Sequence, residues 1–214
     1  MTPPLTRQAT ETTMKLYSMP SSGNSYKVRL LLALSGRAYT REDVEYGSPA
    51  LAVAHRDGHL PFGKAPVLEL DDGRLLPESN AILCWLGEGT RFVPEDALTR
   101  AEMLAWMFWE QNQHEGTIAV RAALLTYDHR KADATPERLA ALLDAGHRNL
   151  AVMERRLSGR DWLVGDAVSL ADICLYAYTH TAGSKGGFGM ERFPAIGRWL
   201  ARIADLPGYV GLND

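Results

Sequence analysis

The chain has 214 residues, of which 46% are apolar and 23% are charged, the usage of an ordinary globular protein. Collagen-like, disordered and low-complexity classes are therefore excluded, and the length allows one large domain or two small ones. Twenty-three Lys and Arg against 26 Asp and Glu give a net charge of -3 without a basic block. We therefore expect no nucleic-acid partner, and no membrane partner either, because no run of about 18 apolar residues exists.

Cysteine usage indicates the compartment. Cys84 and Cys174 each lie in an apolar, helix-like run and do not form the spaced framework of a secreted disulfide fold. We expect two buried free thiols and a reducing, cytoplasmic location. Residues 1–13 lack the apolar stretch of a signal peptide, so we interpret them as a mobile tail upstream of an alternative start at Met14.

Strand-like and helix-like segments alternate in the first part of the chain. A polar turn follows the first strand, and Asp72-Gly73 favours a tight two-residue hairpin turn. The segment between Gly47 and Pro66 reads as irregular. The expected elements are strands at Lys15–Met19, Tyr39–Tyr46, Pro66–Leu70 and Arg74–Leu76, a helix from the turn Ser21–Ser25 to Gly36, and a helix over Asn80–Leu86 capped by Ser79.

Every periodic segment after a charged, glycine- and proline-containing linker looks helical. This shift predicts three parts: an α/β domain over 14–87, a linker over 88–99 and an all-helical domain over 100–214. The expected helices are 100–127, one from Thr135-Pro136 to Leu157, one opened by a Ser169–Asp172 capping box and reaching Thr181, and Pro194–Ala204.

Three polar positions precede helices or strands of the first domain. The turn Ser21–Ser25 opens a helix, where free N–H groups and the dipole favour an anion or a thiolate. Pro66 stands just ahead of a strand, where a cis peptide can expose backbone groups. Glu78 and Ser79 lie at a helix N-terminus. Taken singly, each position is also explained by helix capping or by an ordinary trans proline.

Together, these motifs in this order and spacing resemble the glutathione transferase family. The resemblance covers essentially everything from Met14 onward. The residues that carry it are Ser22–Val28, Pro61–Leu68, Glu78–Ile82, Ser169–Asp172, Arg192–Leu200 and Leu206–Gly208.

The resemblance implies a thioredoxin-like N-terminal domain that binds glutathione as co-substrate and an all-α domain that supplies the second-substrate pocket. Pro66 would be the cis-proline that lets the Ala65 backbone pair with the cysteinyl part of glutathione. Glu78 and Ser79 would hold the γ-glutamyl end, and Lys64 would meet the glycyl carboxylate.

The catalytic donor to the glutathione sulfur is assigned by register within the same resemblance. Counting back from Val28, Ser22 falls where serine-type members place a hydroxyl, with Asn24 and Ser25 as alternatives. No His and Asp pair stands beside Ser22 in the motif, so we expect it to donate a hydrogen bond and not to act as a covalent nucleophile. The missing Cys-x-x-Cys pair argues against dithiol exchange.

The second-substrate pocket is assigned to the helical domain, although a polar helix face with core aromatics explains the same residues. His114-Glu115 lacks the second His of a zinc-binding helix, so we expect no metal. The glycine cluster Gly183–Gly189 follows a helix and predicts a flexible loop. The residues assigned to the pocket are Trp109, Gln113, His114, Thr117, Arg121 and Phe188.

The predicted function is thus a detoxifying transferase in which a glutathione thiolate attacks a small-molecule electrophile. Glutathione-dependent peroxidase or disulfide reductase activity, and a non-catalytic interaction module, remain as alternatives. The resemblance also implies a homodimer, for which the segment after Ser79 and the helix from Arg100, including Trp106, offer apolar surface.

Overall fold

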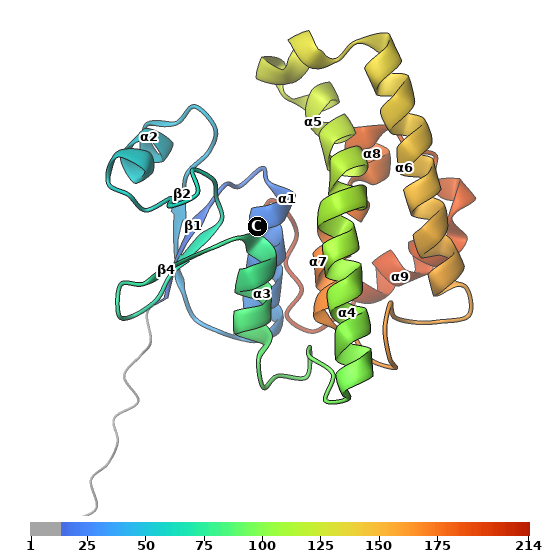
Figure 1. Cartoon of the computed structure of the whole chain (residues 1–214), viewed down its shortest axis with the longest axis horizontal. Helices are drawn as coiled ribbons and strands as arrows, with labels where there is room; N and C mark the ends of the chain where they lie inside the picture. Colours follow the sequence, from blue (N-terminus) through green and yellow to red (C-terminus); the bar gives the residue numbers. More distant parts are fainter. Residues whose placement is uncertain (1–13) are drawn as a thin grey trace, which may run out of the picture.

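The computed structural model describes residues 14–214, so the tail predicted over residues 1–13 lies outside the described residues. An α/β half and a helical half lie side by side (Figure 1). Their elements are β1 (Lys15–Ser18), α1 (Gly23–Leu34), β2 (Thr40–Asp43), α2 (Pro49–Arg56), β3 (Val67–Glu69), β4 (Leu75–Pro77), α3 (Ser79–Gly87), α4 (Ala97–Trp109), the π-helix η1 (Glu110–Ala119), α5 (Val120–Thr126), the 3-10 helix η2 (Asp128–Asp133), α6 (Pro136–Leu157), α7 (Leu170–Thr179), α8 (Ala182–Gly186), the 3-10 helix η3 (Met190–Arg192) and α9 (Pro194–Ala204).

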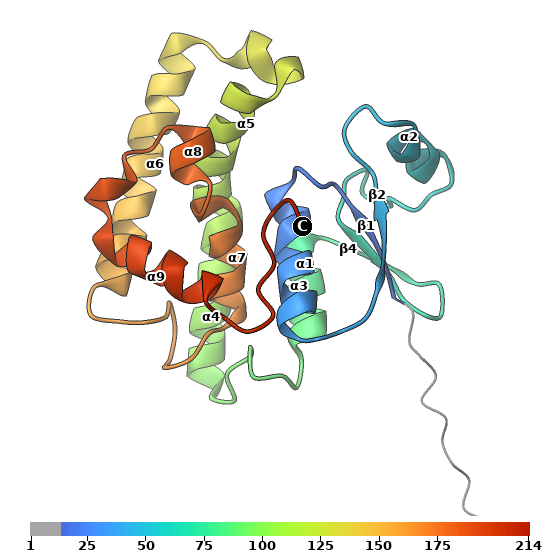
Figure 2. The same ribbon diagram turned by 180° about the vertical axis from the view of Figure 1, so that it is seen from behind.

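The sheet has the strand order β2-β1-β3-β4. β1 pairs with β2 in parallel and with β3 in antiparallel register, and β3 and β4 form the predicted antiparallel hairpin. α1 and α3 pack together on the side of the sheet that faces the helical half, and α2 lies on the other side (Figures 1 and 2). These layers confirm the predicted fold class.

Three local predictions for the α/β half are wrong. The hairpin loop has three residues, 71–73, because Leu70 N–H bonds the Arg74 carbonyl and Gly73 takes the left-handed conformation that closes such a loop. A helix, α2, replaces the irregular segment, with the Ser48 hydroxyl capping it at Leu51 N–H and a proline in its first turn. α3 begins at Ser79 itself, and the cap position belongs to Glu78.

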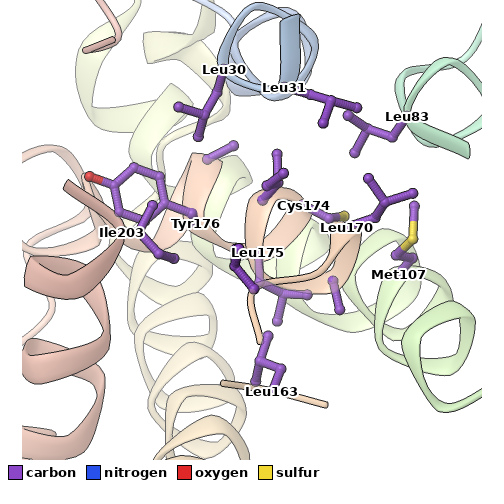
Figure 3. Packing of buried hydrophobic residues seen from close by; sticks show 14 of the residues in the cluster. Leu30, Leu31, Leu83, Met107, Leu163, Leu170, Cys174, Leu175, Tyr176 and Ile203 are labelled. Atoms are coloured by element: carbon purple, nitrogen blue, oxygen red, sulfur yellow. The ribbon is translucent and has the colours of Figure 1, made fainter. Parts of the chain in front are cut away.

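The helical half is organised around α7, which packs on α1 and α3 across the boundary and on α4 within its own half. Figure 3 shows Cys174, Leu175 and Tyr176 of α7 between Leu30 and Leu31 above and Leu163 below. Both cysteines are free thiols, as predicted, with Cys174 buried and Cys84 partly exposed. The described residues form no helix with the length and apolar character needed to cross a bilayer.

The helical half differs from the prediction at two places. The first helix begins at Ala97, three residues ahead of the predicted start at Arg100, because the Asp96 carboxylate caps it at Thr99 N–H. The predicted capping box opens α7 and is confirmed. The glycine cluster is not the predicted loop, since its first part forms the short helix α8, which ends at a left-handed Gly187.

Candidate functional site

A cavity of about 260 Å³ lies between the two halves. On the α/β side it is lined by the turn before α1 and by residues that follow β2. On the helical side it is lined by η1, α5, η2, α7 and α8. The cavity therefore joins the predicted thiol-binding turn to the helical half.

Ser22 lies in the lining of this cavity at the N-cap of α1. Its hydroxyl accepts a long hydrogen bond of 3.5 Å from Ser25 N–H and also lies within hydrogen-bonding reach of the Tyr178 phenol. The next residue, Gly23, is buried against the helical half, and a Cβ there would lie 2.4 Å from the Tyr178 ring. Glycine at this position lets α1 and α7 approach closely beside the cavity.

The two rival donors, Asn24 and Ser25, lie outside the cavity lining. The Asn24 side-chain amide donates to Glu115 Oε1 at 2.7 Å and accepts from the Ser79 hydroxyl at 3.1 Å. The Ser25 hydroxyl is fully buried and accepts from Met19 N–H at 2.9 Å. Neither side chain is part of the cavity lining. Among the three predicted residues, Ser22 is the one that faces the cavity.

The peptide bond between Ala65 and Pro66 is cis, as predicted. Pro66 is buried directly ahead of β3, and Ala65 is half-buried, which leaves part of its backbone accessible. Lys64 is exposed at the end of the preceding loop. These three consecutive residues thus form the end of the loop that leads into β3, an inner strand of the sheet.

Glu78 is the one described non-glycine residue with a positive φ, 71°. Such a conformation costs about 1 to 3 kcal/mol and is concentrated at functional sites. Its side chain is exposed, whereas Ser79 is 4% exposed and hydrogen-bonds Asn24. No side chain caps α3, so the N–H groups of its first turn can receive an anion.

A fully buried ion pair ties the two halves together next to this turn. Lys27 Nζ of α1 lies 2.7 Å from Glu110 Oε2 of η1, and neither side chain has any exposed surface. The Cys174 thiol lies 3.3 Å from the same carboxylate oxygen and 3.1 Å from Asn80 Oδ1. Burial raises the pKa of the Glu110 carboxyl, and the Lys27 ammonium opposes that rise.

The six residues predicted for the second-substrate pocket are not in the cavity lining. His114 is fully buried, with Nε2 2.9 Å from the Thr179 hydroxyl, and burial lowers its pKa to about 3. Trp109 packs edge-on against Trp106, with ring centroids 5.3 Å apart. Gln113 is exposed. These three side chains lie on faces of α4 and η1 that do not line the cavity.

The other three predicted pocket residues connect helices. The Thr117 hydroxyl accepts from the Asn149 side-chain amide of α6 at 3.0 Å and donates to backbone carbonyls of its own helix. The Arg121 guanidinium donates to the Gly186 carbonyl at 2.7 Å and thereby fixes α8. Phe188 is 4% exposed, because its ring fills the space that Gly146 and Gly186 leave open. A Cβ at either glycine would overlap the ring. The glycines make room for a core aromatic, so Phe188 faces the core.

The charged and aromatic residues that do line the cavity are not among those predicted from the sequence. Glu115 enters it from the π-helix, Tyr178 from α7 and Lys185 from α8, while Glu45 and Tyr46 follow β2. No short motif contains these residues. A π-helix, in which hydrogen bonds run from i to i+5, is frequent at functional sites, but composition does not predict it.

Glutathione offers a thiol between two carboxylate ends, and the residues present fit such a molecule. The uncapped α3 N-terminus and Ser79 suit a carboxylate, the accessible Ala65 backbone suits a peptide group, and Ser22 reaches the cavity between the halves. Within residues 14–214, no three His, Cys, Asp or Glu side chains are grouped to hold a metal ion. The site is that of a thiol-binding protein built on a thioredoxin-like domain.

Comparison with known proteins agrees with this class. Residues 16–90 match the glutathione S-transferase N-terminal domain and residues 117–207 match its C-terminal domain. A crystal structure of a glutathione S-transferase from Pseudomonas fluorescens Pf-5 is 40% identical, with a TM-score of 0.87 over 94% of this chain and 99% of that one. The chain belongs to the glutathione S-transferase family.

Two further relatives show the range of the family. Maleylacetoacetate isomerase from Pseudomonas aeruginosa is 30% identical over 90% of each chain. A glutathione transferase from Burkholderia graminis, crystallised with two glutathione molecules per subunit, is 26% identical, with a TM-score of 0.78 over 92% of this chain and 85% of that one.

Proposed function

We propose that the protein is a glutathione transferase in which Ser22 stabilises the thiolate of bound glutathione for attack on an electrophile in the inter-domain cavity. The observation that carries this proposal is that, of the three predicted donors, Ser22 alone lines the cavity. Glu78, Ser79 and the first turn of α3 bind the γ-glutamyl end, the Ala65 backbone pairs with the cysteinyl part, and Lys64 reaches the glycyl carboxylate.

The strength of this hydrogen bond sets the expected activation. A hydrogen bond to a charged group contributes about 1.5 to 3 kcal/mol, and one pKa unit corresponds to about 1.4 kcal/mol. Ser22 therefore lowers the thiol pKa by about one to two units from the ~8.5 of a free thiol. Tyr178 stays protonated beside it, because burial raises the pKa of its phenol well above the usual value.

The test is the pKa of bound glutathione in Ser22→Ala, followed by thiolate absorbance. We expect it to rise by about one to two units while glutathione still binds. Asn24→Ala is the matched control and should shift the pKa less, because the Asn24 amide is already bonded to Glu115. A rise in Asn24→Ala with none in Ser22→Ala would reassign the donor.

Substrate assays separate the proposed conjugation from its alternatives. Neither cysteine lines the cavity, so dithiol exchange has no protein thiol there to attack a disulfide. A glutathione thiolate can still attack oxygen or sulfur, so hydroperoxides and a small disulfide of a thiol other than glutathione belong in the panel beside aryl halides. Turnover of the aryl halide supports the transferase. Glutathione binding without turnover of any of them would favour the interaction module.

We also infer a homodimer formed through α3 and α4, which lie side by side (Figure 1). Trp85 of α3 and Phe108 of α4 are 47% and 65% exposed, while the predicted contact residue Trp106 is half-buried against Trp109. Phe108→Glu should dissociate the pair. Light scattering should give about twice 23.6 kDa for the natural chain, and a mass near 23.6 kDa would reject the dimer.

A further inference from the structure

Charge is distributed unevenly around the cavity. Its two carboxylates are held by hydrogen bonds from the protein. Glu45 accepts from Ser21 N–H at 3.0 Å, from the Ser21 hydroxyl at 2.8 Å and from Tyr46 N–H at 3.0 Å. Glu115 accepts from Asn24 at 2.7 Å and from the Gln111 amide. Both carboxylates therefore have their charge stabilised from within the chain, so they need no cationic ligand.

The two cationic side chains of the lining, Lys185 and Arg130, have fewer charged or hydrogen-bonding partners than the carboxylates have. Lys185 of α8 is half-buried, yet within the described part of the chain no carboxylate lies within 4.0 Å of its Nζ and no side-chain hydrogen bond reaches it. Among the described residues, the carboxylate within 4.0 Å of the Arg130 guanidinium is that of Asp133, at 3.7 Å. An ammonium without an ion-pair partner is available to an anion that enters the cavity.

Between these charged residues, the cavity is lined by small apolar side chains. Ala119, Ala122 and Ala123 come from η1 and α5, and Ala177 comes from α7. Because alanine leaves open space beside the backbone, this wall accepts a compact, flat body. The volume of about 260 Å³ lies just below the range for drug-sized ligands and suits a compact one. Tyr46 stacks on His129, with ring centroids 3.8 Å apart, and both line the cavity.

We infer that the electrophile is a compact anion: an aromatic or other flat body that carries a carboxylate, which Lys185 binds while the reactive carbon faces Ser22. This inference rests on the proposed function and names the substrate class of the same site. Ser22 and Lys185 come from opposite halves of the molecule and line one cavity, so a small molecule can reach the thiol with one end and the ammonium with the other.

The test uses a chlorodinitrobenzoate and its neutral methyl ester. In both, the thiolate sulfur forms a bond to the ring carbon, chloride leaves with the bonding electrons, and the thiol proton goes to solvent. For Lys185→Met we expect kcat/KM for the benzoate to fall about tenfold or more, the effect of losing one charged contact. The ester should be unaffected, and Lys185→Arg should retain most of the preference.

Lys131→Met is the matched control, because it removes the same charge from an exposed lysine outside the cavity. Equal losses for benzoate and ester, or no loss for either, would overturn the inference. A raised KM for glutathione in Lys185→Met would also overturn it, since Lys185 would then bind a carboxylate of glutathione itself.

A binding measurement keeps this inference separate from the transferase activity. Calorimetry with the benzoate is carried out in the presence of S-methylglutathione, which has no thiol to react. Weaker binding to Lys185→Met than to Lys131→Met supports the anion site even if the protein conjugates neither compound, in which case only the proposed function fails. Equal binding to both variants overturns the anion site.

Discussion

The two halves of the molecule build their parts of the site in different ways. In the α/β half, each functional position lies in a short segment where a strand or loop meets a helix, such as Ser22 before α1 and Glu78-Ser79 before α3. In the helical half, the cavity wall is spread over η1, α5, η2, α7 and α8, with one or a few residues from each. Local backbone geometry positions the site residues of the α/β half, and tertiary packing positions those of the helical half.

Because the two halves contribute different parts of the site, their relative position must be fixed. A thiol bound on the α/β half reacts only if the helical half holds the electrophile within reach, and misplacement by about 1 Å can cost two orders of magnitude in rate. The Lys27–Glu110 pair and the Asn24–Glu115 hydrogen bond cross the boundary beside the thiol-binding turn. Both contacts use carboxylates of the π-helix η1, so this helix holds the helical half against the α/β half.

The largest expected effect is on stability, from breaking the buried ion pair. Lys27→Met should lower the free energy of unfolding by about 3 to 5 kcal/mol, because it leaves the Glu110 carboxylate buried without its counter-charge. Urea unfolding at neutral pH measures this loss. The double variant Lys27→Met/Glu110→Leu should recover much of it, since both charges are then gone. Full stability in the single variant would show that the pair does not hold the halves together.

The next effect is on glutathione affinity. Ser79→Ala should weaken binding by about 2 kcal/mol, the low end for losing one partner of a buried charged contact, and Glu78→Ala should cost less because Glu78 is exposed. Calorimetry with glutathione measures both. Gln113→Ala in the helical half is the control and should leave affinity unchanged. Unchanged affinity in both site variants would refute the binding assignment.

The same contrast governs what the sequence could predict. The turn at Ser22, the cis bond before Pro66, the β3–β4 hairpin and the α7 capping box each depend on a few adjacent residues, and all four are present. Side-chain chemistry restricts the backbone locally at the turn, the hairpin and the capping box, so a short pattern is enough to find them, whereas the cis bond before Pro66 is expected only from the family resemblance.

The cavity wall could not be predicted in this way. Alanines 119, 122, 123 and 177 resemble any helix interior, and only packing shows that they face an open space. His114 and Glu115 are neighbours with similar polarity, yet η1 buries one and turns the other into the cavity. From the sequence, Phe188 looks like a loop residue, whereas in the fold its ring fills the space left by Gly146 and Gly186.

The smallest effect concerns acid stability and distinguishes His114 from a cavity residue. Because burial holds its pKa at about 3, His114 stays neutral in the folded protein, whereas in the unfolded chain it takes up a proton below about pH 6.5. The unfolded state then binds one more proton, so the free energy of unfolding falls as pH decreases from about 6.5 towards 3. At pH 5 this one residue should cost about 2 kcal/mol relative to pH 7, at about 1.4 kcal/mol per pH unit.

Urea unfolding at pH 7 and pH 5, for the natural chain and for His114→Gln, isolates this contribution. Glutamine cannot take up the proton and retains a hydrogen-bonding amide toward Thr179, so the variant should lose stability at pH 7 but show a pH dependence smaller by about 2 kcal/mol. An unchanged dependence in His114→Gln would mean that the imidazole is protonated in the folded state and so reaches water, as a residue of the cavity would.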